Sequence, residues 1–328
     1  MRRLAVRCLG ILLGVSVIAV TAGVFWAWDS YRAEGPLEKP VTIIIPKGTG
    51  VQDIAGLLTS AGAIDNVRLF VLGAQYTWAA RRMRAGEFAL TPGMSMRAVA
   101  DHLVNGETVK RRLTVPEGLL TEEVVSLVAA TEGLIGDVPV DRPDGIYLPE
   151  TYFFSYGDTR ASVLSRMKKA MDQALNEAWA ARARRISITS AREALILASI
   201  IERETGVEVE RAEVSGVFHN RLRRKMRLQS DPTVAYAVTG GGRPLGRPLT
   251  RSDLYTDSDY NTYRRVGLPP GPIANPGRAA LMAAVRPAET NFLYFVADGT
   301  GGHAFAETLR EHNRNVAKWR RINRQRVK

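Results

Sequence analysis

Two glutamates that directly follow an apolar run are the residues of this sequence best suited to acid–base chemistry. The run at residues 195–201 (LILASII) leads straight into Glu202 and Glu204, which places apolar side chains next to carboxyl groups. A carboxyl group beside apolar side chains loses hydration, which disfavours its charged form and raises its pKa toward neutral pH. The same pattern also fits a core helix that simply ends in solvated glutamates.

The spacing of the two glutamates separates their roles. Residues two apart on a helix point about 200° away from each other, so at most one of the pair faces a cleft and the two cannot share a proton. Gly206 suits a helix end, and residues 208–224 are expected to form a second helix. On that helix Arg211 or Arg221 would pair with a carboxylate or, as is more common, be exposed.

The overall composition excludes several classes of protein. A chain of 328 residues, 45% of them apolar, is expected to form two or three units with a real core. The net charge of +12 does not indicate nucleic acid, because Lys and Arg are scattered and become dense only at residues 310–328, which we expect to be a solvated tail. An anionic membrane surface or a cell-wall polymer would use the same charge.

Cysteine and histidine usage supports neither a disulfide nor a metal site. Cys8 is the only cysteine, so no disulfide can form within the chain. The four histidines show no paired ligand spacing, and we therefore expect no metal.

The apolar segment at residues 8–28 contains no charged residue and predicts a transmembrane helix. At about 1.5 Å per residue it is long enough to cross the ~30 Å hydrocarbon core of a bilayer. Three arginines lie in residues 1–7 and Asp29 follows the segment, so the positive-inside rule places the N-terminus in the cytoplasm and the rest outside it. A cleaved signal peptide is the competing interpretation, but the segment is long for one and ends in bulky Trp-Ala-Trp-Asp.

An internal repeat follows a short tether. The tether, residues 29–40, would reach on the order of 40 Å and keep the chemistry near the membrane. In three copies a strand-like run ends at Pro and Gly and is followed by apolar residues at the three- and four-residue spacing of a helix. The strand-like runs are residues 41–48, 86–93 and 112–118. We therefore predict three strand–turn–helix units.

The first copy, VTIIIPKGTGVQDIAGLL, resembles the opening of LysM modules, small strand–helix units that bind glycans containing N-acetylglucosamine. The alternative is that these units only pack into a mixed sheet. Residues 144–157 (DGIYLPETYFFSYG) are dense in aromatic side chains, which would either be core or line a sugar groove, since sugar rings stack on aromatic rings.

The remaining segments give local predictions. Residues 159–185 are expected to form a long amphipathic helix. Asp231 followed by Pro232 predicts a helix start, with Asp231 as the N-cap and Pro232 at the first helical position. Residues 291–298 are expected to form a strand, and residues 299–305 a tight hairpin turn.

Taken together and in order, several segments resemble the YceG-like family of endolytic murein transglycosylases, the MltG type. They are the apolar span, the LysM-like part, LPETYFF, ASIIERET, VFHNRLRRKMRLQSDPTV, YNTYRRVGLPPGPIANPG and FLYFVADGTGGHAF. The resemblance implies an α+β fold with a single N-terminal transmembrane helix, a LysM-like β/α subdomain at residues 41–112 and a mixed α+β catalytic domain at residues 113–328. In that domain the catalytic glutamate would end a buried helix, and the domain would close with the basic C-terminal tail.

The resemblance also implies a site and a reaction. The family's catalytic glutamate corresponds, within ASIIERET, to Glu204, with Glu202 as the supporting candidate. The implied reaction is a lyase reaction that cleaves the β-1,4 bond between N-acetylmuramic acid and N-acetylglucosamine within nascent glycan strands, leaves a 1,6-anhydro end and terminates strand elongation. No metal or organic cofactor is implied. The candidates for gripping the sugars, each of which could instead be structural, are Gln229, Ser230, Asp231, Tyr260, Asn261 and Tyr263.

The implied partners are peptidoglycan glycan strands and the bacterial inner membrane, with the catalytic domain in the periplasm; peptidoglycan synthases stay open as partners and nucleic acid is not expected. Two other functions stay open. One is a non-catalytic, membrane-anchored scaffold that binds peptidoglycan for cell-wall synthesis. The other is a glycan hydrolase that uses water and a second carboxylate, Asp231 or Glu150.

Overall fold

The computed structural model describes residues 2–138 and 143–326, with side chains described from Gly10 to Gln325. The first residue of the expected cytoplasmic segment and the last two residues of the expected basic tail lie outside the described residues.

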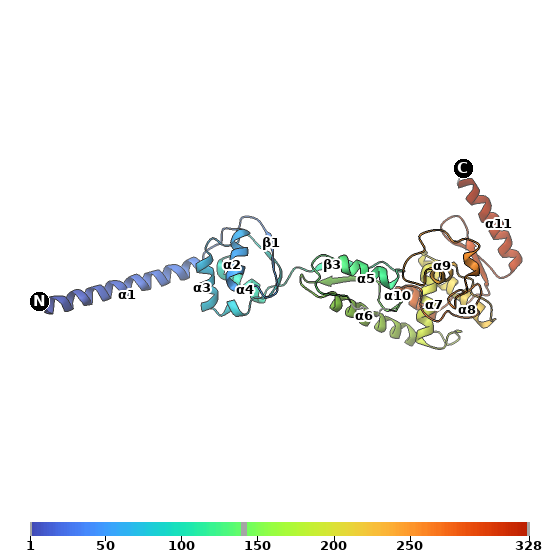
Figure 1. Ribbon diagram of the computed structural model, residues 1–328, viewed down its shortest axis with the longest axis horizontal. Coiled ribbons are helices and arrows are strands. Elements are labelled where there is room, and N and C mark those ends of the chain that lie inside the picture. Colours follow the sequence, from blue (N-terminus) through green and yellow to red (C-terminus); the bar gives the residue numbers. More distant parts are fainter. Residues whose placement is uncertain (1, 139–142, 327–328) are drawn as a thin grey trace. The chain divides into compact units, whose positions relative to one another are not determined.

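The chain divides into two compact units. Unit 1 comprises residues 1–111 and 153–158, and unit 2 comprises residues 112–152 and 159–328. The helices and strands before the division are α1 (Arg2–Arg32), β1 (Val41–Ile45), α2 (Val51–Ser60), α3 (Val67–Tyr76), the 3-10 helix η1 (Ala79–Arg81), β2 (Gly86–Leu90) and α4 (Met96–Asn105) (Figure 1). Those from the division onward are β3 (Arg111–Thr114), α5 (Thr121–Ala130), β4 (Thr151–Phe154), α6 (Arg160–Ala180), α7 (Ala191–Glu204), η2 (Glu208–Glu210), α8 (Arg211–Arg223), α9 (Asp231–Thr239), η3 (Asp253–Tyr255), α10 (Arg278–Val285), β5 (Tyr294–Ala297), β6 (His303–Ala306) and α11 (Leu309–Arg326). Helices and short two-stranded sheets together give the expected mixed α+β class.

The three predicted strand–turn–helix units are confirmed. β1 precedes α2, β2 precedes α4 and β3 precedes α5. The turn residues Gly48, Gly93 and Gly118 have φ angles of 84°, 73° and 76°, a left-handed conformation that glycine adopts without the steric cost of a Cβ. β1 and β2 pair antiparallel, with Ile43 opposite Phe88, so the first two copies share one sheet, whereas β3 pairs with β4.

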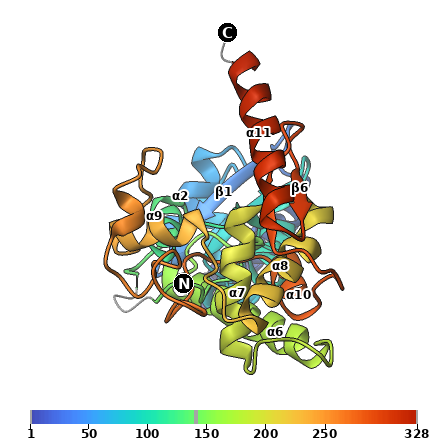
Figure 2. The same ribbon diagram turned by 90° about the vertical axis from the view of Figure 1, so that its right-hand side faces the viewer.

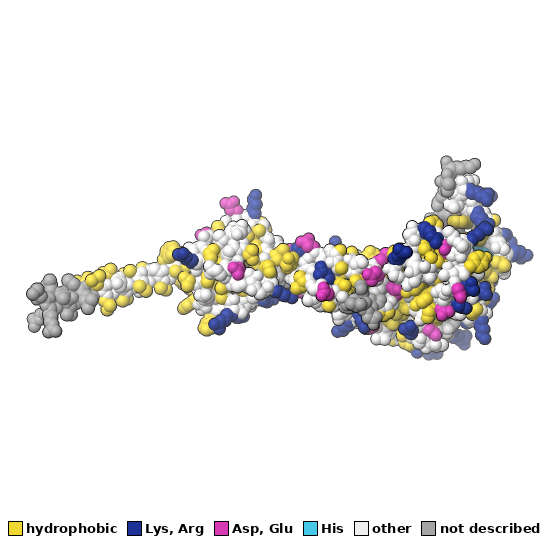
Figure 3. Space-filling model, viewed as in Figure 1, with side chains coloured by type: hydrophobic (Ala, Val, Ile, Leu, Met, Phe, Trp, Pro, Cys, Tyr) yellow, Lys and Arg dark blue, Asp and Glu magenta, His cyan; other side chains and the backbone are white. Residues whose placement is uncertain are grey.

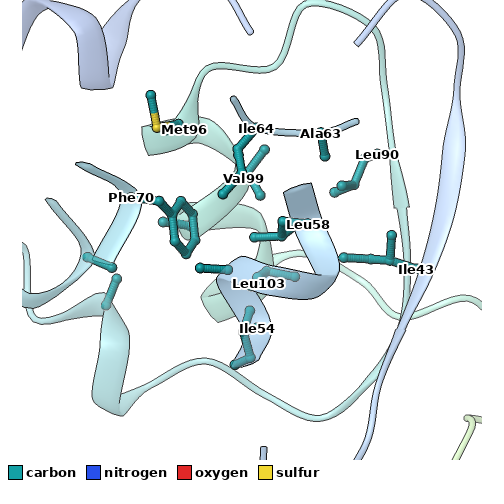
Figure 4. Close-up of a cluster of buried hydrophobic side chains, with 14 of the residues drawn as sticks. Ile43, Ile54, Leu58, Ala63, Ile64, Phe70, Leu90, Met96, Val99 and Leu103 are labelled. Carbon is teal, nitrogen blue, oxygen red and sulfur yellow. The ribbon is translucent and has the colours of Figure 1, made fainter. Parts of the chain in front are cut away.

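Unit 1 is held by a core of aliphatic and phenylalanine side chains (Figure 4). Leu58 of α2 and Leu103 of α4 are fully buried and lie beside Phe70 of α3 in Figure 4. Both helices place their apolar residues three and four apart, so one face of each packs inward.

A second pass of the chain completes unit 1. Residues 153–158 return to it after the first part of unit 2. There the hydroxyl of Ser155 lies 3.0 Å from the hydroxyl of Thr108 and accepts a hydrogen bond of 3.0 Å from the amine of Lys110, while Phe154 is buried. Unit 1 therefore depends on a segment distant in sequence.

The junction between α1 and the rest of unit 1 is packed, which differs from the expected tether. α1 continues to Arg32, and the ring of Tyr31 is only 1% exposed. Beyond the helix, the amide of Gly35 donates to the carbonyl of Gly93, and the amide of Gly93 donates to the carbonyl of Leu37. The first residues of the expected tether are thus helical, and later ones are fixed to unit 1 by backbone hydrogen bonds.

The part of α1 from Gly10 onward has the character of a membrane span. Gly10–Arg32 is long enough to cross a bilayer and contains an unburied 18-residue stretch with a mean hydropathy of 2.1. Length and composition alone support this assignment, and a signal sequence satisfies the same criteria.

α7 lies at the centre of unit 2 and packs against α6, α8 and α10 (Figure 2). Small residues make this packing close: Ala194 and Ala198 of α7 and Ala280 and Ala284 of α10 are all fully buried. The apolar run predicted to be a buried wall is confirmed, because every described residue from Ile196 to Ile201 is buried. α6 matches the expected amphipathic helix, with its buried residues three and four apart.

One buried amide ties separate loops of unit 2 to one another. Asn275, fully buried, accepts a hydrogen bond from the backbone amide of Tyr147 at 2.9 Å and donates to the carbonyl of Leu119 at 3.0 Å and to the hydroxyl of Thr121 at 3.1 Å. Such a fully satisfied buried polar group rigidifies the segments it joins. These loops flank the last turn of α7, since Gly118 accepts a hydrogen bond from Arg203.

The C-terminal basic segment, predicted to be a solvated tail, forms the helix α11, and its described Lys and Arg side chains are exposed as expected. α11 contacts the hairpin formed by β5 and β6, which confirms the predicted strand. The predicted turn at residues 299–305 is confirmed only in its first part, because residues 303–305 belong to β6. The ring of His312 stacks on Tyr294 with centroids 5.2 Å apart, and Ile322 lies against the turn at Gly299. The apolar and aromatic residues spaced along α11 explain why it folds back despite its charge.

A glycine-to-alanine pair tests the packed junction of α1. In Gly73→Ala the new Cβ would lie about 2.4–2.6 Å from ring atoms of Tyr31, so we expect a destabilisation on the order of 1–3 kcal/mol. Gly56→Ala is the matched control, because Gly56 also lies in a helix of unit 1 and its Cβ would meet nothing within 4 Å. Urea unfolding of both variants measures the difference, and equal effects would contradict a packed junction.

Candidate active site

Glu204 is the last residue of α7, at the point where the buried helix reaches solvent. The next residue, Thr205, has an extended backbone, and its amide donates to the carbonyl of Ile201, which ends the helix. Glu204 itself is partly exposed, whereas the helix behind it is buried. A long apolar helix therefore presents one carboxyl group at its end.

The hydroxyl of Ser230 donates a hydrogen bond of 2.5 Å to Oε1 of Glu204. Ser230 occupies the N-cap position of α9, yet its side chain makes no capping hydrogen bond. Our prediction that Asp231 is the N-cap was wrong by one position, since Asp231 is the first helical residue. An N-cap hydroxyl normally stabilises the start of its helix, but the hydroxyl of Ser230 binds the carboxyl group of Glu204 instead.

Two buried threonines fix the position of Ser230. The amide of Ser230 donates to the hydroxyl of Thr262 at 3.0 Å, and the hydroxyl of Thr233 donates to the carbonyl of Ser230 at 2.7 Å. The two threonine hydroxyls lie 2.8 Å apart and both side chains are buried. Sequence reasoning missed them, although Thr262 stands between two predicted site residues and Thr233 follows the predicted helix start.

The surroundings of Glu204 raise its pKa to about 7, mainly because burial removes hydration from the carboxylate. The hydrogen bond from Ser230 opposes this shift, the negative charge of Asp231 adds to it, and the positive charge of Arg221 opposes it. A carboxyl group with this pKa is protonated in a large fraction of molecules at neutral pH, so it can donate a proton and then take one back.

Asp231 and Tyr263 form a polar pair near this carboxyl group. The hydroxyl of Tyr263 donates to Oδ1 of Asp231 at 2.7 Å, and Asp231 is exposed. Burial, the bond to Asp231 and the charges of Asp231 and Glu204 raise the pKa of Tyr263, so this phenol stays protonated. Glu204, Ser230, Asp231 and Tyr263 are the predicted residues that the structure brings together.

Arg221 is a buried cation behind the site. Its guanidinium donates to the carbonyls of Leu228 at 2.5 Å and Leu293 at 2.7 Å and lies 5.5 Å from the ring centroid of Tyr294. The expectation that this arginine is exposed was wrong, because α8 is buried on the side that carries it. Two of its nitrogens donate to backbone carbonyls, and it acts on the pKa of Glu204 through its charge.

Glu202 points into a different cluster, as the helical angle predicts. Its carboxylate accepts a hydrogen bond of 2.9 Å from the amide of Gly277 and lies 3.6 Å from the guanidinium of Arg211, which also lies 3.5 Å from Glu117. Of the two alternatives for Arg211, pairing with a carboxylate is confirmed and exposure is not. Burial raises the pKa of Glu202, and the amide and Arg211 oppose the shift. The structure does not bring Glu202 to Ser230.

The remaining predicted residues have separate places. Gln229 is exposed with a left-handed φ of 49°, and its backbone amide donates to the carbonyl of Thr262. Asn261 is fully buried, and its amide group donates to the carbonyls of Leu254 at 3.1 Å and Thr256 at 2.8 Å, so it holds the loop and is not free to grip a sugar.

The rings of Tyr260 and Tyr236 are in contact, tilted by 37° with centroids 4.6 Å apart, and the hydroxyl of Tyr236 donates to Asp144 at 2.6 Å. Tyr236 lines two hollows. One, of about 190 Å³, is also lined by Pro232 and Arg203, and the other, of about 450 Å³, is also lined by Tyr260. Sequence reasoning did not single out Tyr236. The two hollows lie along α9, the helix that begins with Ser230 at its N-cap.

The aromatic segment at residues 144–157 is mostly core. Tyr147, Tyr152 and Phe154 are buried, and the hydroxyl of Tyr152 donates to the carbonyl of Leu148. Glu150, an alternative second carboxylate, lies 2.6 Å from the guanidinium of Arg278. Among the described residues, no group of three or more His, Cys, Asp or Glu side chains is placed to hold a metal ion.

Comparison with known proteins places this geometry in a family. The model of the YceG-like family matches residues 43–318. The chain belongs to the YceG-like family. A YceG-like protein from Listeria monocytogenes has a solved structure with a TM-score of 0.53 and 30% identity, covering 84% of this chain and 99% of that one.

Curated relatives in this family carry a functional name. The chain is 33% identical over 322 residues to a protein of Bacillus subtilis named endolytic murein transglycosylase, covering 87% of both chains. A Streptococcus pneumoniae protein of the same name is 29% identical over 325 residues, covering 85% of this chain and 58% of that longer protein. A transglycosylase of this kind is a lyase that acts on peptidoglycan.

Removal of the Ser230 hydroxyl tests the electrostatics of the site. In Ser230→Ala the Glu204 carboxylate loses its donor, and we expect its pKa to rise above about 7, by on the order of one pH unit. Carbon-13 NMR titration of labelled glutamate side chains measures the pKa, and Ser126→Ala, at an exposed serine of α5, is the control. An unchanged pKa would mean that the hydrogen bond does not stabilise the charged form.

The raised pKa of Glu204 also predicts a pH-dependent cost in stability. The unfolded carboxyl group ionises near pH 4.5 and the folded one near pH 7, so the stability due to this group is full below pH 4.5 and is lost as the pH rises through about 7. Glu204→Gln should therefore be more stable than the wild type at pH 8, by up to about 3 kcal/mol at ~1.4 kcal/mol per pH unit. Urea unfolding at pH 4.5 and pH 8 tests this, and a difference that does not vary with pH would argue against it.

Proposed function

We propose that this protein is a peptidoglycan lytic transglycosylase that cleaves the β-1,4 bond between N-acetylmuramic acid and N-acetylglucosamine within glycan strands. The observation that carries the proposal is the single carboxyl group of Glu204, with a pKa of about 7, at the solvent end of a buried helix. The name endolytic murein transglycosylase, given to relatives in Bacillus subtilis and Streptococcus pneumoniae, supports the same reaction class.

The reaction needs one group that first donates and then accepts a proton. Protonated Glu204 gives its proton to the glycosidic oxygen as the bond to the muramyl anomeric carbon breaks, which releases the N-acetylglucosamine hydroxyl. The resulting carboxylate takes the proton of the muramyl C6 hydroxyl while that oxygen bonds to the anomeric carbon. The product is a 1,6-anhydro end, no water is consumed, and Glu204 regains its proton.

The groups around Glu204 suit both halves of this cycle. The hydroxyl of Ser230 stabilises the carboxylate after the first transfer, while burial keeps that carboxylate basic enough to accept the second proton. The substrate's own acetamido group would stabilise the positive charge at the anomeric carbon. In this proposal the neutral phenol of Tyr263 and the carboxylate of Asp231, which bond to each other, bind sugar hydroxyls.

Further sugar contacts extend along α9. The adjacent rings of Tyr236 and Tyr260 border a hollow of about 450 Å³, and aromatic rings bind the C–H faces of sugars. Exposed Gln229 could reach the strand from the other side of Ser230. The LysM-like segment, residues 41–112, is proposed as a further glycan contact in unit 1 on its sequence resemblance alone.

The place of action follows from α1. We assign the stretch of α1 from Gly10 to Arg32 as a single-pass anchor in the inner membrane, with the chain after it on the periplasmic side, because its length and hydropathy suit a span and three arginines lie before this stretch. An anchored enzyme that cuts within nascent strands would terminate their elongation. Glycan strands and the membrane are then its partners.

Glutamine substitutions test the assignment of the acid. Glu204→Gln should abolish cleavage of purified glycan strands, because the amide has a similar volume but no titratable proton. Glu202→Gln is the matched control: it should retain cleavage and lose stability, since its amide cannot pair with Arg211 as a carboxylate does. Mass spectrometry of the products and circular dichroism of both variants give the two readouts.

The product masses also separate the alternative reactions. A lytic transglycosylase leaves anhydro ends, whereas a hydrolase that uses Asp231 to activate water leaves reducing ends heavier by one water. Wild-type rates in Glu204→Gln would sink the assignment of the acid. Intact strands with the wild-type protein would point to a scaffold.

A further inference from the structure

A cluster of exposed apolar and aromatic side chains continues from α1 onto the rest of unit 1. Soluble proteins rarely expose such side chains together on one surface. Phe25 of α1 is 73% exposed, Leu72 and Tyr76 of α3 are 63% and 76% exposed, and Trp78 is 67% exposed. Figure 3 shows hydrophobic side chains on α1 and on the adjoining rest of unit 1. We call these four residues and the surface they share the α1–α3 face.

The α1–α3 face includes a hollow of about 740 Å³ between the two helices. Its walls are mainly apolar and include Val24 and Trp28 of α1 and Leu69 of α3, together with Leu72 and Tyr76 of the face itself. An apolar hollow of this size at the end of a candidate membrane span suits the upper part of a lipid acyl chain.

The orientation of this face relative to α1 is fixed by packing. Tyr31 is buried against Gly73, and Trp28 meets Tyr76 edge to face with ring centroids 5.6 Å apart. All these contacts lie within unit 1, so α3 is held beside the last turns of α1. If α1 spans a bilayer and leaves the hydrocarbon core at these last turns, the α1–α3 face lies at the membrane surface.

The charges of this region match an anionic surface. Residues 67–86 contain no Asp or Glu but four arginines, all of them exposed: Arg68, Arg81, Arg82 and Arg84. The guanidinium of Arg81 lies 5.8 Å from the ring centroid of Trp78. Trp and Tyr beside Arg are the residues that membrane interfaces select, because one part of each side chain is apolar and the other polar.

The backbone at Trp78 adds a further observation. Its φ of 60° is left-handed, a conformation that a bulky residue rarely adopts, and it leaves the ring in solvent. The packing of unit 1 does not use this ring, so the ring is available to something outside the chain.

From these observations we infer that the α1–α3 face of unit 1 is seated in the interfacial layer of an anionic phospholipid bilayer. The inference rests on the proposed anchoring of α1 and goes beyond it, because it makes part of unit 1 itself a lipid-binding surface. Leu72 and the hollow meet acyl chains, Tyr76 and Trp78 lie at headgroup level, and Arg81 and Arg82 meet lipid phosphates.

Nitroxide depth measurements on the full chain in anionic nanodiscs test this. In a Cys8→Ser background, which leaves no other cysteine, single labels are placed through Leu72→Cys on the face, Gln52→Cys on exposed α2 and Val17→Cys within α1. We expect the label at position 72 to collide several-fold more with oxygen, relative to a water-soluble nickel complex, than the label at position 52. The label at position 17 reports whether α1 is inserted.

The outcomes separate this inference from the anchoring on which it rests. Water-like collisions at both 72 and 52, with 17 in lipid, would overturn the seated face and leave the anchor intact. Water-like collisions at 17 would refute the anchor and the inference together. A label at 72 shielded from both reagents would overturn the inference in favour of a protein occupant.

A charge-reversal pair tests the anionic partner. Arg81→Glu combined with Arg82→Glu should lower the oxygen preference of the label at 72 toward that at 52. Lys39→Glu combined with Lys47→Glu makes the same change in charge at exposed lysines outside the face and should leave it unchanged. Equal effects of the two pairs, or equal results in zwitterionic nanodiscs, would overturn the role of the arginines.

Discussion

The removal of one carboxyl group from water is the constraint on which the arrangement of unit 2 depends. Glu204 ends a helix whose preceding residues are buried from Ile196 to Ile201, so its charge is formed against an apolar wall. One hydroxyl, that of Ser230, restores only part of the lost hydration, and the pKa stays near 7. A second strong donor would return the group to an ordinary carboxylate, and the absence of any donor would leave its anion too unstable to form.

The environment of Arg221 shows how this balance is kept. A direct pair between a guanidinium and a carboxylate lowers the pKa of the acid by about one to three units. Arg221 is close enough to influence the pKa of Glu204, yet its Nε and Nη1 atoms donate to the carbonyls of Leu293 and Leu228. Its positive charge therefore moderates the pKa without fixing Glu204 in the charged form.

The features of the fold that depend on the spacing of nearby residues could be predicted from the sequence. The strand–turn–helix copies, the buried run of α7 and the opposite directions of Glu202 and Glu204 all follow from the spacing of nearby residues. The misses depend on contacts between distant residues. No local pattern shows that Ser230 bonds to a residue 26 positions earlier, or that Arg221 and Asn261 find backbone carbonyls inside the fold. The packing of the tether and of the C-terminal helix was missed for the same reason, since their partners Gly93 and Tyr294 lie elsewhere in the chain.

The return of residues 153–158 to unit 1 has a consequence for the history of the chain. Ser155 and Phe154 belong to the packing of unit 1, although most of the residues on either side of them belong to unit 2. The polypeptide therefore crosses the division three times, and no single cut in the gene separates one complete unit from the other. A module of this kind is not readily exchanged between genes by recombination, so the two units are expected to have been inherited together and to diverge as a pair.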